Sequence, residues 1–136
     1  MKSIPVSELT GAALDWAVAL ALGWKMRRVP RDIDGNHGGE VLAPPDLSKD
    51  FQWPPRGWIA PWYFIRPWSS EWAQGGPLVH KYQIELKWMG VDGKAMWWMA
   101  GHEGIAIKQI GDTPLIAACR AIVASKFGDT VEVPSN

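Results

Sequence analysis

The residues best suited to chemistry gather in one short stretch, RPWSSEWAQGG, at positions 66–76. It interleaves two tryptophan rings with an arginine, two hydroxyls, an amide and a glycine pair. Aromatic faces stack on nucleobases at about 1–3 kcal/mol per base, and arginine pairs with phosphate through a bidentate fork. Backbone N–H groups beside glycines can close on a ligand oxygen. The combination predicts a site for a nucleotide-type molecule.

The expected ligand-binding residues are Arg56, Trp62, Arg66, Trp68, Ser69, Ser70, Trp72, Gln74, Gly75 and Gly76. A competing interpretation is that the tryptophans hold together a loop that lacks helices and strands, because a large flat ring packs well against other rings. We expect this packing role for at least half of the five tryptophans at positions 53, 58, 62, 68 and 72.

Metal binding has weaker support in the sequence. The three histidines, at positions 37, 80 and 102, share no ligand spacing with one another or with Cys119. The segment from Asp32 resembles a calcium loop only in part, because its glycine precedes the third ligand. We therefore expect neither a metal nor a cofactor.

A catalytic nucleophile is not indicated either. Cys119 falls on the apolar stripe of a predicted helix, where a free cysteine is most often a small inert hydrophobe. Ser69 and Ser70 lack the flanking glycines of a nucleophile elbow. Glycines 35, 38 and 39 fit neither the dinucleotide fingerprint nor a phosphate-binding loop. We expect a protein that is not an enzyme.

The composition of the chain limits the number of domains, the kinds of partner and the cellular location that we expect. A chain of 136 residues suits a single domain, 1–136. The 14 basic and 14 acidic residues balance, so the positive field that drives duplex-DNA binding is missing and duplex DNA is an unlikely partner. One cysteine excludes an internal disulfide. No secretory signal core and no apolar run of roughly 20 residues is visible, so we expect a cytoplasmic protein without membrane contact.

The first predicted helix covers residues 7–24, with Ser7 or Thr10 as its cap and Gly23 after its last turn. Apolar residues at helical spacing form one face of this helix: Leu9, Ala13, Trp16, Ala17, Leu20 and Trp24. The opposite face is also apolar, with Ala12, Val18 and Leu22. A helix that is apolar on both faces is buried or forms a subunit contact, so we expect a homo-oligomer through this helix.

The second predicted helix lies in GDTPLIAACRAIVASKFGD, residues 111–129. Asp112 or Thr113 can cap it, Pro114 suits its first position and Gly128 its end. Its expected core stripe is Leu115, Ile116, Cys119, Ile122, Val123 and Phe127.

Strands are predicted between the two helices. Residues 80–88 alternate apolar and polar, an Asp92-Gly93 turn follows, and residues 95–100 and 105–110 continue an antiparallel meander around a turn at 101–104. Residues 27–77 hold most of the prolines and little periodicity, so we expect an ordered, irregular Trp/Pro-rich lobe with at most one short edge strand in 58–66. The expected fold class is α+β: a three- to four-stranded antiparallel sheet packed with two helices, plus this lobe.

Three blocks of the chain are similar to one known family. ELTGAALDWAVALALG (8–23), SSEWAQGGPLV (69–79) and GDTPLIAACRAIVASKFGDTVEVP (111–134) together resemble the NinX-like family of small phage and prophage proteins. This chain has Glu71 where family members share an aspartate, and Cys119 where they have a methionine. The resemblance implies a phage origin and an accessory role, and it transfers no catalytic residue.

Two functions of different classes follow. The first is a non-catalytic binder that sequesters a nucleotide-type small molecule, namely a host immune signal such as a cyclic nucleotide or an ADP-ribose derivative. The second is an interaction module whose tryptophan-rich surface docks a host or phage protein, since aromatic residues and arginine are enriched in interface cores. Weak binding of single-stranded nucleic acid is a third alternative, because a neutral chain lacks the electrostatic funnel but keeps the stacking platform.

Overall fold

The computed structural model describes residues 2–31, 39–53, 59–88, 98–101 and 109–134. The chain divides into two compact units, Met1–Ala21 with Arg66–Asn136, and Leu22–Ile65. Helices and antiparallel strands give an α+β fold, as predicted. That the whole chain, 1–136, forms one domain stays a prediction.

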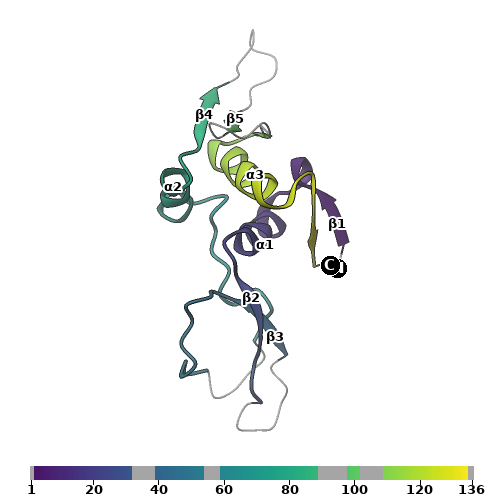
Figure 1. Ribbon diagram of the computed structural model, residues 1–136, viewed down its shortest axis with the longest axis vertical. Helices are drawn as coiled ribbons and strands as arrows, with labels where there is room; N and C mark the ends of the chain where they lie inside the picture. Colours follow the sequence, from purple (N-terminus) through teal and green to yellow (C-terminus); the bar gives the residue numbers. More distant parts are fainter. Residues whose placement is uncertain (1, 32–38, 54–58, 89–97, 102–108, 135–136) are drawn as a thin grey trace. The chain divides into compact units, whose positions relative to one another are not determined.

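The described residues of the first unit form three α-helices and five strands, and Figure 1 shows their arrangement. In chain order these elements, with one short 3₁₀ helix, are β1 Lys2–Pro5, the 3₁₀ helix Val6–Glu8, α1 Gly11–Ala21, α2 Trp72–Lys81, β4 Glu85–Trp88, β5 Trp98–Gly101, β6 Gln109–Gly111, α3 Pro114–Phe127 and β7 Thr130–Val133. Among the described residues, no helix has both the length and the apolar character needed to cross a membrane.

Helix α3 forms the centre of this unit, packing against α1, β5 and β6. Its ends match the sequence prediction: the backbone N–H of Ile116 donates to the Thr113 hydroxyl oxygen at 3.1 Å, Pro114 begins the helix, and Gly128 follows with a φ of 84°. Eight consecutive residues, Ala117–Ala124, are buried. The prediction of a core position was wrong for Phe127, whose side chain is 40% exposed on the last turn.

Helix α1 is buried by other elements of the same chain. Leu14–Ala19 are all buried, and six consecutive positions include every face of a helix. Its neighbours in the unit are α3 and β7, and Gly23 takes the predicted left-handed conformation after its end, with a φ of 91°. The two apolar faces therefore have partners within one subunit, and assembly through this helix stays a prediction.

The predicted meander is present as the antiparallel sheet β4-β5-β6. Leu86 pairs with Ala100, which pairs with Gln109, and in the neighbouring row Lys87 pairs with Met99, which pairs with Ile110. The side chains of Ile84 and Leu86 pack with buried Ala100, Ala117 and Ala121, so one face of the sheet lies on α3. The predicted turn at 92–93 and most of that at 101–104 lie outside the described residues.

Helix α2 was not predicted, and residues 72–77 were wrongly assigned to the irregular lobe. The helix also shortens the predicted strand 80–88, which begins at Glu85. Gly75, Gly76 and Pro77 disfavour a helix in isolation. Local propensity is overridden because the first turn packs closely against buried residues, as the contacts of Gly75 described below show.

The two ends of the chain pair with each other, which the sequence did not predict. Strands β1 and β7 are antiparallel, with Lys2 opposite Val133 and Pro5 opposite Thr130 (Figure 1). The Val6 N–H then donates to the Asp129 carbonyl at 2.8 Å. This pairing closes the unit around α1 and α3.

The unit Leu22–Ile65 is more regular than the predicted lobe. Its hairpin consists of β2, Lys25–Arg28, and β3, Glu40–Ala43, paired antiparallel. The sequence allowed at most one short edge strand in 58–66, and the described residues 59–66 contain none. There the Tyr63 N–H donates to the Ala60 carbonyl and the Ile65 N–H to that of Trp62, closing tight turns. Prolines in this segment favour turns over a strand ladder.

Candidate functional site

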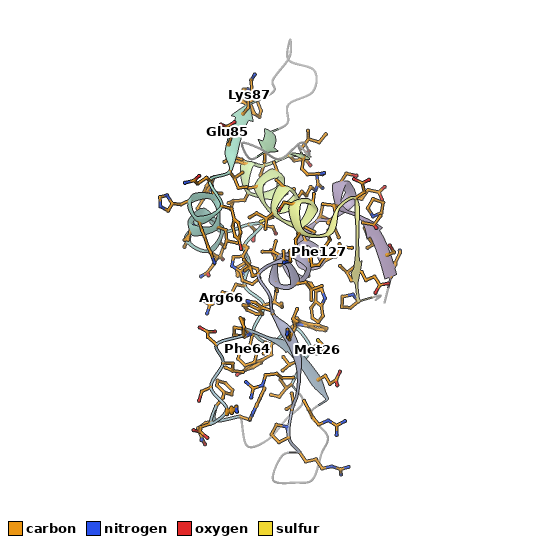
Figure 2. The ribbon with its side chains drawn as sticks, viewed as in Figure 1. Met26, Phe64, Arg66, Glu85, Lys87 and Phe127 are labelled. Atoms are coloured by element: carbon orange, nitrogen blue, oxygen red, sulfur yellow. The ribbon has the colours of Figure 1, made fainter. Side chains whose placement is uncertain are left out.

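The segment from Arg66 to Trp72 has two adjacent buried residues, Trp68 and Ser69, between an exposed Arg66 and three exposed residues at 70–72. Trp68 and Ser69 are each only 4% exposed. Arg66 and Ser70 are exposed, and the Trp72 side chain is 54% exposed at the first residue of α2. Arg66 is labelled in Figure 2 at the start of this segment. Part of the predicted binding stretch is therefore buried packing, and the rest is at the surface.

A buried carboxylate on α1 anchors this segment through hydrogen bonds on its interior side. The backbone N–H of Ser69 donates to Asp15 Oδ1 at 2.8 Å, and the Ser69 hydroxyl donates to the same side chain. Asp15 is 7% exposed. Burial raises the pKa of Asp15 above its ordinary value of 3.8, and the two hydrogen bonds from Ser69 oppose this rise. The anchor was missed at the sequence level, where its signal was one acidic residue in an otherwise apolar helix.

The Asp15→Asn variant should lose a pH dependence that the natural chain has. Because the folded protein holds the Asp15 proton more tightly than the unfolded chain does, this residue favours folding most below pH 3.8, and that contribution is lost as the pH rises through the raised folded pKa. Asparagine keeps an oxygen for the Ser69 N–H. The stability of the variant relative to the natural chain should therefore be higher at pH 7 than below pH 3.8, measured by urea denaturation.

The control for this experiment is Asp46→Asn, at an exposed position in the other unit. Its free energy of unfolding is measured at the same two pH values. Parallel stability curves for Asp15→Asn and the natural chain would contradict the assignment of a raised pKa to Asp15.

Gly75 provides the second fixed point under the segment. A Cβ atom added at Gly75 would collide with the carbonyl oxygen of Trp68 and would lie 2.8 Å from Leu115 Cδ2. Both distances are shorter than van der Waals contact allows, so the first turn of α2 can approach Trp68 and α3 this closely only with glycine. At Gly76 the nearest atom, Trp72 Cε3, would be 3.4 Å away. The two neighbouring glycines therefore have different roles.

The predicted site residues separate into four groups. Arg56 lies outside the described residues, and Trp62 belongs to the unit Leu22–Ile65, where its ring is 58% exposed. Trp68, Ser69 and Gly75 are buried. The remaining five, which we call the Trp72 surface, are exposed or partly exposed in the first unit: Arg66, Ser70, Trp72, Gln74 and Gly76.

In the unit Leu22–Ile65, aromatic rings pack against one another and against a buried apolar cluster. Phe51, Trp53 and Phe64 meet edge to face, with ring centroids 5.0–5.9 Å apart. Trp53 and Phe64 also lie against a buried cluster of Val29, Val41 and Ile59. The packing interpretation is therefore confirmed for Trp53 and Trp68, and Trp58 lies outside the described residues.

Two further ionisable residues, Cys119 and Arg120, are buried among the described residues of the first unit. Cys119 is 1% exposed, as its place on the apolar stripe predicted, and burial raises the pKa of its thiol to about 12. A thiol that stays protonated is a poor nucleophile. Arg120 donates through Nε to the Leu9 carbonyl at 3.0 Å and through a terminal nitrogen to that of Ile110 at 2.7 Å. This second buried anchor was also missed from the sequence.

The described residues contain no group of three or more His, Cys, Asp or Glu side chains that could hold a metal ion. His80 is exposed, while His37 and His102 lie outside the described residues.

Comparison with known proteins identifies a family. The family model described as "Bacteriophage P22, NinX" matches residues 5–126. No curated protein matches the chain.

Proposed function

Because the chain belongs to the NinX family of bacteriophage P22, we propose that it is a phage accessory protein that binds a nucleotide-type small molecule at the Trp72 surface without catalysis. The ligand would be a signal of the host immune response, such as a cyclic nucleotide or an ADP-ribose derivative, sequestered in the cytoplasm of the infected bacterium. The main support for the proposal is the exposed indole of Trp72, which lies on a segment that buried residues hold in place.

The fixed segment favours binding on entropic grounds. Trp68, Ser69 and Gly75 hold the backbone in place through burial, the Asp15 hydrogen bonds and close packing. A site that is already ordered loses less conformational entropy when a ligand binds. The anchor residues thus contribute to affinity indirectly, by presenting Arg66, Ser70 and Trp72 in one conformation.

The chemistry of the surface suits a small polar ligand with a flat ring. Trp72 offers a face on which a base can stack, Arg66 a fork for phosphate and Ser70 a hydroxyl. Charged and polar residues surround the single ring along the chain, including exposed Glu71. The centre of a protein interface is instead depleted of charge. The balance of groups therefore favours a nucleotide-type ligand over a protein hot spot.

Protein docking is the second candidate, and one observation favours it. The first unit carries other large apolar side chains that are 40–54% exposed, namely Trp88, Ile110 and Phe127 in addition to Trp72. These residues lie on β4, β6, α3 and α2. Large exposed apolar side chains often mark interaction sites when they form a continuous patch.

The test is calorimetric titration of the purified chain with cyclic dinucleotides and ADP-ribose derivatives. Trp72→Ala should weaken binding about tenfold to a hundredfold, since one stacked base contributes about 1–3 kcal/mol. Arg66→Gln should also weaken it. Neither change should lower the melting temperature appreciably, because both side chains are exposed.

Phe127→Ala is the matched control: it removes another exposed aromatic ring, from the far end of α3, and should leave affinity unchanged. If no ligand of the panel binds the natural chain, the nucleotide proposal fails and protein docking becomes the leading candidate.

A further inference from the structure

Strand β4 is an edge strand in the described part of its sheet. It lies at one end of the order β4-β5-β6, and among the described strands only β5 pairs with it. An edge strand presents a row of backbone N–H and C=O groups that can accept another strand. Natural proteins cover such edges or use them for assembly.

The side chains of β4 are divided by charge and polarity between the two faces of the sheet. Glu85 and Lys87 are both exposed, and Figure 2 shows them extending from β4. Leu86 lies on the other face with Ile84, packed on the α3 side. Trp88 follows on the same face as Leu86 by strand alternation, and its ring is 47% exposed. The strand thus has an acidic and a basic residue on one face and apolar residues on the other.

We propose that β4 pairs antiparallel with β4 of a second copy of this chain, about a two-fold axis at Leu86. The two three-stranded sheets then form one continuous sheet with α3 of both copies on the same face. In this register Glu85 faces Lys87 of the partner subunit, and Lys87 faces the partner's Glu85. The contact is isologous, as in most homodimers. This inference is independent of the proposed ligand binding.

The charges select this register over its neighbours. Shifting the axis to Lys87 places the two lysines directly opposite each other, and like charges in that position destabilise a sheet. An axis between Leu86 and Lys87 places Glu85 opposite Trp88 of the partner subunit, so a charged residue meets an apolar one and the faces no longer match. Only the axis at Leu86 forms two attractive charge pairs and keeps apolar residues together on the α3 face.

Apolar contacts across the axis add to the charge pairs. Leu86 lies opposite its own symmetry mate, and Trp88 lies opposite Ile84 of the partner subunit. Cross-strand pairs between aromatic and β-branched residues stabilise antiparallel sheets. The pairing would cover part of the Trp88 ring that is exposed in the single chain.

Sedimentation velocity of the full chain, from micromolar to submillimolar concentration, tests the proposal. The natural chain should approach twice its mass of 15.1 kDa as concentration rises. Lys87→Glu and Glu85→Lys should each weaken dimerisation about tenfold or more, because each change turns two attractive pairs into repulsive ones. The double variant Glu85→Lys/Lys87→Glu should restore it. An equimolar mixture of the two single variants should form heterodimers.

Lys126→Glu is the control for net charge, since it makes the same charge change as Lys87→Glu at an exposed position on α3. It should leave the dimer intact. Circular dichroism should show that every variant keeps its fold, because Glu85 and Lys87 are exposed. A natural chain that stays monomeric throughout the concentration range, or a dimer that the single charge reversals do not weaken, would overturn the proposal.

Discussion

Replacing Trp68 by alanine should destabilise the folded chain by about 3–5 kcal/mol, the usual effect of truncating a buried tryptophan. The Trp68 ring is 4% exposed, and its carbonyl oxygen lies directly against Gly75 of α2. Removing the ring therefore leaves a cavity beneath the segment that carries the Trp72 surface. Thermal denaturation should show a large fall in melting temperature, at roughly 4 °C for each kcal/mol.

Trp72→Ala is the matched control, because the same residue type is removed four positions along the chain from a ring that is 54% exposed. Its melting temperature should stay close to that of the natural chain. Equal loss of stability in the two variants would contradict the division of the segment into buried and exposed residues. It would also show that Trp72 contributes to the core.

Local sequence signals predicted the elements whose ends and faces are determined by neighbouring residues. Thr113, Pro114 and Gly128 marked both ends of α3, and the structure places each in the expected role. The alternation through Ile84 and Leu86 likewise identified the strand that lies on α3. Caps and alternation act over a few residues, so a single sequence is enough to reveal them.

Pairings between distant segments could not be predicted in the same way. Strand β1 reads locally as a polar start to the chain, and it is a strand because Lys2–Pro5 pairs with Thr130–Val133 at the other end. The β2-β3 hairpin is similar, since its two strands are separated by residues 29–39. Nothing within either short segment specifies its partner.

The sequence predicted which residues make up the candidate site, but not which of their side chains face the interior and which face solvent. The stretch 66–76 was correctly identified as unusual, yet its burial follows a turn and the start of a helix, not a constant period. Sequence patterns locate inward-facing residues only where the period is regular. Ser69 is held inward by Asp15, more than fifty positions earlier in the chain. The exposed half of the site could therefore be separated from the packed half only in three dimensions.

The second large effect is expected from adding one methyl group at Gly75. Gly75→Ala should destabilise the fold by about 1–3 kcal/mol, the usual range for an overpacked site. The added Cβ would collide with the Trp68 carbonyl oxygen, and a backbone atom cannot rotate away as a side chain can. Alanine favours a helix over glycine by about 1 kcal/mol, so the measured loss is what remains after this gain. Urea denaturation gives the free energy of unfolding directly.

Gly76→Ala should instead raise the free energy of unfolding. The comparison would identify the close contacts at Gly75 as the cause of the loss. The two glycines are neighbours in the same helix, but outside its chain neighbours a Cβ at Gly76 would meet Trp72 Cε3 at an ordinary contact distance of 3.4 Å. Part of the helix gain of about 1 kcal/mol should then appear as added stability, since Pro77 restricts the residue before it. Opposite effects of two neighbouring substitutions of the same kind would be explained by the close approach of α2 to Trp68 and Leu115 at Gly75. If both variants were stabilised, this approach would not be a requirement of the fold, and Gly75 would not be one of the fixed points beneath the Trp72 surface.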